Sequence, residues 1–185
     1  TYYFSAAEYG VVSEFYAYAG FFSVLLLFGF ETGYFRFRDK EHTGRDVAYS
    51  TALIFVVLVN LVFFLVILLI NSRLSAALNY ANHPEYVLCF TLILTLDAIA
   101  SIPFARLRAE DKAFRFAGIK VTEILTTVLL SLFFIIYCPK VYAENPQSWI
   151  AEIYNPAIGI GYIFIANLMA SLFKFLLLAP QLKGL

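Results

Sequence analysis

The sequence predicts an all-α membrane protein with five transmembrane helices. Apolar residues make up 62% of the 185 residues and charged residues only 14%. Five apolar runs each approach the ~20 residues that a helix needs to cross ~30 Å of hydrocarbon. They span residues 11–30, 52–70, 87–104, 116–137 and 156–178. A soluble domain of this length would not carry five such runs.

Lysine and arginine are concentrated in alternate connectors between these runs. The basic connectors hold Arg36, Arg38, Lys40 and Arg45 after the first run, and Arg106, Arg108, Lys112 and Arg115 after the third. The second and fourth connectors hold only Arg73 and Lys140, and Lys183 follows the last run. Because cytoplasmic connectors collect Lys and Arg, the pattern predicts an N-terminus outside and a C-terminus inside.

The first two runs differ in their polar content. The first run is expected to end near Gly29 and Gly33, before a polar connector that is predicted to be solvated. The second run is aliphatic and aromatic apart from Asn60, so it is expected to face lipid or to pack against apolar neighbours.

Prolines set the expected limits of the other three runs. The stretch 82–85 (Asn-His-Pro-Glu) is typical of a helix start, with a polar cap, Pro in the first turn and an acid at the positive end of the helix dipole. The third run is expected to stop or bend at Pro103, and the fourth to end before Pro139. The fifth is expected to begin at Pro156 and to end before Pro180.

The chain begins at Thr1 and has an odd number of predicted spans. We therefore expect a fragment that lacks at least one preceding helix. Two cysteines are too few for a disulfide framework, so Cys89 and Cys138 are predicted to be independent apolar residues.

Two function classes receive no support from the sequence. The formal net charge is zero, so nucleic-acid binding is not expected. There is no phosphate-binding glycine loop, no His-Glu-x-x-His motif and no nucleophile paired with a histidine. We expect no enzyme activity, no metal and no cofactor.

Polar side chains recur at helical spacing within four of the runs. The first run offers Ser13, Tyr16, Gly20 and Ser23, and the other three stripes contain charged residues. Those three stripes are Asp97, Ser101 and Arg108; Lys120, Glu123, Thr127 and Ser131; and Asn167, Ser171 and Lys174. Ionisable groups in a span usually face a bundle interior or a wet cavity. We predict a cavity lined by Ser101, Thr127, Asn167 and Ser171. Since Asp97 and Lys120 are nearly equidistant from the turn near Ala109, we predict that they pair.

Most of the in-membrane charges fall in the half of the bundle that is predicted to be cytoplasmic. Such a cavity suits a substrate with an anionic head group taken from the inner leaflet. The candidate head-group cations are Arg36, Arg106, Arg108, Lys120 and Lys174. The candidate ion-coupling or buried-pair acids are Glu31, Asp97 and Glu123. The simplest alternative is that the arginines are topology anchors and that Lys120 extends to the interface.

Two stretches resemble a known family. They are EYGVVSEFYAY at 8–18, continuing to FGFETGYFRF at 28–37, and LDAIASIPFARLR at 96–108, followed by FRF at 114–116. Both resemble bacterial polysaccharide biosynthesis proteins of the O-antigen flippase type, within the multidrug/oligosaccharidyl-lipid/polysaccharide exporter superfamily. The resemblance covers most of the chain, in the order expected for family helices two to six.

The resemblance implies a fold of twelve to fourteen helices in two six-helix lobes. It implies a transporter in the bacterial inner membrane that flips undecaprenyl-diphosphate-linked oligosaccharide from the inner to the outer leaflet, by alternating access, for surface polysaccharides such as lipopolysaccharide O-antigen. Residues 1–185 would be an N-terminal lobe without its first helix, and the C-terminal half would be its partner. Arg36, Arg106 and Arg108 match basic positions of the family and would hold the diphosphate.

Three other functions stay open. A drug or cation exporter of the same superfamily would favour an acidic, aromatic cavity without arginines at its inner rim. A non-transporting scaffold subunit would pair its in-membrane charges fully and leave no cavity. A glycosyltransferase or polymerase would need an acid in an outer loop, where Glu144 and Glu152 are available. For transport, the expected coupling ion is H⁺ or Na⁺.

Overall fold

The computed structural model of the chain describes residues 6–38, 44–80, 82–145, 147–150 and 154–182. Within them its helices are α1 (Ala6–Leu27), α2 (Phe30–Phe37), α3 (Arg45–Ala77), α4 (Pro84–Ala109), α5 (Ala113–Leu132), the π-helical η1 (Phe133–Tyr137), α6 (Cys138–Glu144), the 3₁₀ turn η2 (Pro156–Ile158) and α8 (Gly161–Leu182). Five helical spans in these residues are long and apolar enough to cross a membrane. The predicted all-α, multi-pass class is confirmed. Lys40, Glu152 and Lys183 lie outside the described residues.

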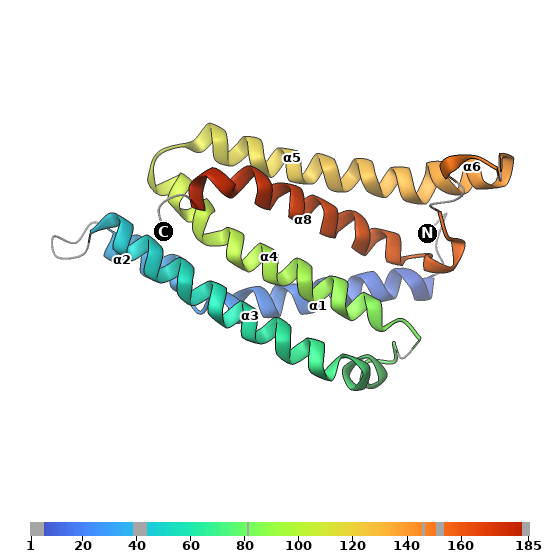
Figure 1. Cartoon of the computed structure of the whole chain (residues 1–185), viewed down its shortest axis with the longest axis horizontal. Coiled ribbons are helices and arrows are strands. Elements are labelled where there is room, and N and C mark those ends of the chain that lie inside the picture. The colour runs from blue at the N-terminus through green and yellow to red at the C-terminus, as the bar shows by residue number, and fades with distance from the viewer. Residues whose placement is uncertain (1–5, 39–43, 81, 146, 151–153, 183–185) are drawn as a thin grey trace.

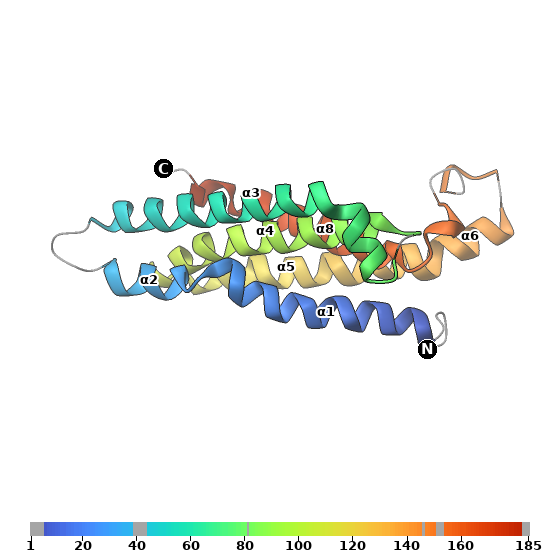
Figure 2. The ribbon, with the colours of Figure 1, turned by 90° about the horizontal axis from the view of Figure 1, so that it is seen from below.

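The five spans run side by side, with α8 between α4 and α5 (Figure 1). Helix α4 is central, because it contacts α1, α2, α3, α5 and α8. Helices α1 and α3 also contact each other, and the view from below shows α3 along one edge of the bundle and α1 along the other (Figure 2). Helix α2, the α4–α5 turn and the end of α8 share one end of the bundle, which we call the basic end. Its described cations are Arg36, Arg38, Arg106, Arg108, Lys112 and Arg115.

Two left-handed residues separate α1 from α2. Phe28 has φ 47° and Gly29 has φ 69°, and an α-helix cannot continue through such a pair. The break turns α2 onto α3. Phe30 then stacks on Phe55 with ring centroids 4.1 Å apart. The end of the first helix near Gly29 is where the sequence predicted it.

The helices do not stop at their prolines as predicted. Helix α4 continues through the buried Pro103 to Ala109, and α8 continues through Pro180. The predicted end before Pro180 was wrong, and of the stop or bend predicted at Pro103 the stop does not occur. A proline removes one helical hydrogen bond, but packing against neighbouring helices preserves a transmembrane helix around it. The predicted end before Pro139 was also wrong, because the helical span Ala113–Glu144 continues past it through the π-helical turn η1 into α6.

Helix α3 uses its one mid-span polar residue to bind α1. Asn60 is fully buried and its Nδ2 donates to the carbonyl oxygens of Val56 at 2.8 Å and Leu26 at 3.3 Å. The opposite face of α3 exposes Leu61, Leu65 and other apolar side chains. The sequence predicts that an exposed apolar face of this kind contacts lipid or apolar neighbours.

Gly161 opens α8 in close contact with Tyr86, and an alanine there should destabilise the fold. A Cβ would lie 2.7 Å from Tyr86 Cε1 and 3.0 Å from Ile158 Cγ2. The ring is fixed because the Tyr86 hydroxyl donates to the Ile158 carbonyl at 3.0 Å. We expect Gly161→Ala to lower the free energy of unfolding by about 1–3 kcal/mol, measured by thermal unfolding in detergent. Gly118→Ala is the matched control, because nothing lies within 4 Å of its Cβ and alanine favours a helix. Equal unfolding temperatures for the two variants would contradict this account of the packing.

Candidate functional site

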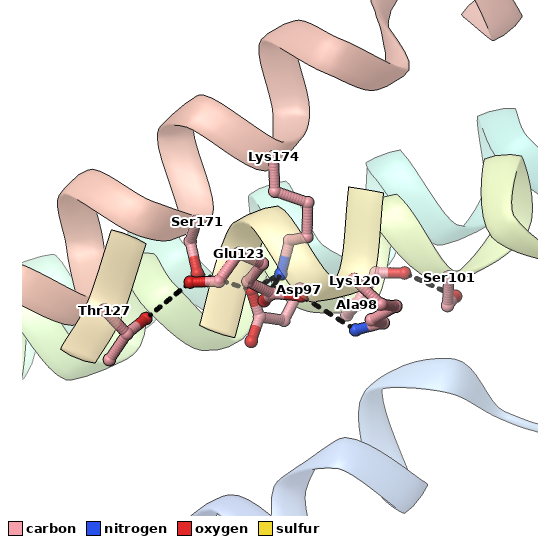
Figure 3. Close-up of polar contacts among 8 residues, drawn as sticks. All are labelled: Asp97, Ala98, Ser101, Lys120, Glu123, Thr127, Ser171 and Lys174. Carbon is pink, nitrogen blue, oxygen red and sulfur yellow. Dashed lines mark hydrogen bonds and ion pairs between the residues drawn. The ribbon is translucent and has the colours of Figure 1, made fainter. Parts of the chain in front are cut away.

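Four ionisable side chains from three helices form one charged network inside the bundle (Figure 3). The Lys174 ammonium on α8 lies 2.5 Å from Asp97 Oδ1 on α4 and 2.5 Å from Glu123 Oε1 on α5. The Lys120 ammonium, also on α5, lies 3.0 Å from Glu123 Oε2. Two ammonium groups and two carboxylates make the network formally neutral.

Burial differs sharply within this network. The side chain of Lys174 is 2% exposed and that of Glu123 16%, whereas Asp97 is 44% exposed and Lys120 43%. A buried ammonium needs counter-charges and hydrogen bonds to offset its desolvation, and two carboxylates supply them. The network therefore has a dry centre at Lys174 and accessible ends at Asp97 and Lys120.

Helix α8 supplies both donors that hold Asp97. Ser171 and Lys174 share one face of α8, and the Ser171 hydroxyl donates to Asp97 Oδ1 at 2.7 Å. The predicted Asp97–Lys120 pair was wrong: Asp97 binds Lys174, while Lys120 binds Glu123 and lies 4.7 Å from the centroid of the Phe104 ring. The physical reason is lateral order, because α8 packs between α4 and α5.

The network lies deep in the membrane-spanning region. Asp97 is twelve residues before the end of α4 at Ala109, or about 18 Å along the helix axis at about 1.5 Å per residue. Glu123 is ten residues into α5, or about 15 Å. The hydrocarbon core of a membrane is about 30 Å thick, so both carboxylates lie near mid-depth. Charges at that depth normally face a protein interior or a wet cavity.

A cavity of about 110 Å³ between α1, α4, α5 and α8 meets the network, and we call it the central cavity. Its polar lining is Tyr16, Asp97, Glu123, Thr127, Asn167 and Ser171. Phe15, Phe90 and Phe164 contribute aromatic walls. A polar cavity of this size has room for several water molecules. Asp97 and Glu123 meet open space in this cavity, whereas the exposed Lys120 is not among its lining residues.

The structure brings three of the four predicted cavity-lining residues together. Thr127, Asn167 and Ser171 line the central cavity, and Asn167 Nδ2 donates to the Tyr16 hydroxyl at 2.9 Å, which links α8 to α1. Ser101 is not among the lining residues, and its hydroxyl donates to the Ala98 carbonyl of its own helix at 2.6 Å.

At the basic end, Arg106 joins three helices. Its guanidinium lies 4.4 Å from the Tyr49 ring centroid on α3, binds Glu110 at 2.9 Å and donates to the Gln181 carbonyl of α8 at 3.3 Å. The Tyr49 hydroxyl donates to the same carbonyl at 3.0 Å. Asp46 lies 3.5 Å from the guanidinium. Because its guanidinium is engaged in these contacts, Arg106 has a structural role that joins α3, α4 and α8.

The other two predicted arginines keep exposed surface. Arg108 pairs with Glu31, which ties α4 to α2, and lies between the rings of Phe35 and Phe116; its side chain is 42% exposed. Arg36 is exposed on α2. Both therefore have surface on which an external anion could bind.

A second carboxylate contact, at the end opposite the basic end, was not anticipated. Glu14 on α1 accepts hydrogen bonds from Tyr18 and from Tyr80 of the α3–α4 connector, each at 2.7 Å. Burial, together with the hydrogen bond to Glu14, raises the pKa of Tyr80 to about 12. The sequence feature that could have predicted this contact is Glu14 itself, because a charged residue inside the first apolar run requires a partner.

The described residues contain no group of three His, Cys, Asp or Glu side chains that could hold a metal. Cys89 and Cys138 are both free thiols. Glu144 lies 4.0 Å from Lys140 in an ion pair between exposed side chains.

Comparison with known proteins places most of the chain in one family. The model of a family described as "Polysaccharide biosynthesis protein" matches residues 3–143. The match includes Asp97, Lys120 and Glu123, whereas Lys174 lies beyond it. No curated protein and no solved structure matches the chain.

Removing the shared cation should destabilise the bundle. Lys174→Met leaves Asp97 and Glu123 beside each other without their common partner, and we expect a loss of about 3–5 kcal/mol. Adding Asp97→Asn leaves the neutral Lys120–Glu123 pair and should recover more than half of that loss. Thermal unfolding of both single variants and the double variant gives the coupling energy. Lys140→Met, at an exposed lysine, is the control; strictly additive effects would show that Lys174 and Asp97 do not interact.

The contacts of Glu110, just beyond the end of α4, should make stability depend on pH. Hydrogen bonds from Lys112 first, and then from Arg106, lower the pKa of Glu110 below its ordinary value of 4.5. A lowered folded-state pKa contributes stability above the unfolded pKa, and that stability is lost as the pH falls through the folded value. We expect Glu110→Gln to be less stable than wild type at neutral pH and to lose less stability below pH 4.5. Parallel stability–pH curves would contradict this role for Glu110.

Proposed function

Because the chain belongs to the polysaccharide biosynthesis protein family, we propose that it forms part of a flippase for lipid-linked oligosaccharide. Family membership supports a role in polysaccharide synthesis, and the five spans make the chain a multi-pass membrane protein. The proposed substrate is an undecaprenyl-diphosphate-linked oligosaccharide, moved from the inner to the outer leaflet by alternating access. Its product would enter surface polysaccharide such as O-antigen.

The observation that carries this proposal is the exposed carboxylate of Asp97 at mid-depth. Lipid does not solvate a carboxylate, so this group must face a water-accessible path or another polar element. The central cavity provides such a surface, with hydroxyl and amide groups beside the charges. A polar path at mid-depth is what a transporter needs to carry a sugar and a diphosphate through the membrane.

The predicted head-group cations divide by their contacts. Lys174 and Arg106 are held by protein carboxylates, whereas Arg36, Arg108 and Lys120 keep exposed surface. Arginine binds phosphate oxygens through paired hydrogen bonds, and lysine acts as a point charge. We assign the diphosphate to Arg108 on loading, with Lys120 on the route toward the central cavity.

Asp97 and Glu123 are the proposed coupling acids, with H⁺ or Na⁺ as the ion. Both contact Lys174, so neutralising either carboxylate would weaken one side of the junction between α8 and its neighbours. That change would let α4 or α5 move relative to α8, as alternating access requires. Glu31 is instead assigned a pairing role, because it binds Arg108 at the basic end.

We place the basic end on the cytoplasmic side of a bacterial inner membrane, from the distribution of Lys and Arg. The proposed partners are membrane lipid, the lipid-linked substrate and the remaining half of the transporter. The proposal involves no catalysis, no nucleic acid and no cofactor other than the coupling ion.

Drug or cation export is the second candidate. The aromatic walls and two acids of the central cavity favour it. The exposed arginines at the basic end and the family description favour a lipid-linked anion instead. A purely structural subunit would have no need of a cavity beside charges that are already paired.

The test is flipping of a fluorescent undecaprenyl-diphosphate oligosaccharide by the full-length protein in liposomes. Asp97→Asn should slow flipping by about tenfold or more, the effect of losing about 1.4 kcal/mol in the rate-limiting step. Asp111→Asn is the matched control, since Asp111 is exposed and its left-handed backbone (φ 55°) accepts asparagine.

Unchanged flipping by a folded, inserted Asp97→Asn protein would make Asp97 a packing residue. Absence of flipping by the wild type under both proton and sodium gradients would overturn the proposal. Transport of a fluorescent organic cation under the same gradients would then establish the second candidate.

A further inference from the structure

A second cavity, of about 380 Å³, lies between α2 and α3 at the basic end, and we call it the α2–α3 pocket. Phe30, Gly33 and Phe37 line it from α2, and Ala48 and Ala52 line it from α3. Its lining is mostly apolar, and Thr51 and Tyr34 are the lining residues that carry hydroxyls. It shares no lining residue with the central cavity.

The backbone break after α1 creates this pocket. The left-handed Phe28 and Gly29 turn α2 against α3, where Phe30 stacks on Phe55 and the Tyr34 ring meets the Tyr49 ring edge-on at 6.0 Å. Between these contacts the facing residues are small, and a Cβ on Gly33 would have no atom within 4 Å. The aromatic contacts set the distance between α2 and α3. The small residues between them do not fill the space, which leaves the pocket.

A cation lies beside the pocket at the depth of lipid head groups. The Arg36 guanidinium is 5.9 Å from the centroid of the Phe37 ring, which lines the pocket. The first membrane span runs from Tyr9 to Phe37, so Arg36 lies at its last turn, next to the interface. An apolar slot at the end of the first span thus adjoins an exposed guanidinium, where lipid phosphates are expected.

We propose that the α2–α3 pocket binds one hydrocarbon chain of an anionic phospholipid from the surrounding leaflet, with its phosphate at Arg36. The apolar lining selects a chain, and the guanidinium selects a phosphate. The shared chemistry, a phosphate on a hydrocarbon chain, also describes the proposed substrate. We assign the pocket to a resident phospholipid because it is separate from the central cavity. Arg108 and Lys120 are then the exposed cations left for the substrate.

The test is native mass spectrometry of the full-length protein in detergent, titrated with phosphatidylglycerol and with phosphatidylcholine of the same chains. The wild type should bind phosphatidylglycerol more tightly. Gly33→Leu fills the pocket from a helical glycine that has open space, and it should weaken both lipids by on the order of tenfold, as expected for losing a few buried methylenes. Arg36→Gln should weaken phosphatidylglycerol about fivefold and leave phosphatidylcholine unchanged.

Two variants serve as matched controls. Gly118→Leu places the same side chain on another helical glycine with open space, and Arg115→Gln removes another exposed arginine of the basic end. Both should bind phosphatidylglycerol as the wild type does.

Unchanged phosphatidylglycerol binding by folded Gly33→Leu protein would overturn the proposal. Displacement of the phospholipid by lower concentrations of polyprenyl diphosphate would assign the pocket to the substrate instead, and would also overturn it. Neither readout depends on flipping, so failure of the proposed transport leaves this measurement interpretable.

Discussion

The buried ammonium of Lys174 is the constraint on which the rest of the bundle depends. A lysine 2% exposed at mid-membrane depth is tolerable only with counter-charges in direct contact, and Asp97 and Glu123 supply them from two different helices. These contacts hold α8 between α4 and α5. They also orient Asp97 so that part of its carboxylate reaches the central cavity. The buried Lys174 ammonium therefore explains both the packing of α4, α5 and α8 and the polarity of the central cavity.

The helices are joined at both ends of the bundle by contacts that do not involve Lys174. A change of charge at Asp97 or Glu123 would therefore affect helix packing mainly in the middle of the bundle. At the basic end Arg106 joins α3, α4 and α8 through Tyr49, Glu110 and the carbonyl of Gln181. At the opposite end Glu14 joins α1 to the α3–α4 connector through Tyr80. A change in the charge of the central network would thus act on helices whose ends stay attached. This arrangement is suited to the movement of helices about their ends.

Two cavities with different chemistry suggest two different uses of lipid-like molecules. The central cavity offers carboxylates, hydroxyls and an amide between aromatic walls, which suits the polar groups of the proposed substrate. The α2–α3 pocket offers apolar surface beside one arginine, which suits a bound amphiphile. Their separation follows from the helix break at Phe28 and Gly29, since that break lays α2 on α3.

The sequence by itself determined the class of protein, the number of spans and the residues that carry charge into the membrane. Hydropathy and spacing along one helix are local properties, so the stripes containing Asp97, Glu123 and Lys174 were predictable. It did not determine which stripes meet, and depth alone favoured Lys120 as the partner of Asp97. The tertiary structure decided that α8 lies between α4 and α5, because the order of helices around a bundle depends on all their contacts at once. It also decided that α4 and α8 continue through Pro103 and Pro180, because packing against neighbouring helices outweighs the loss of one hydrogen bond.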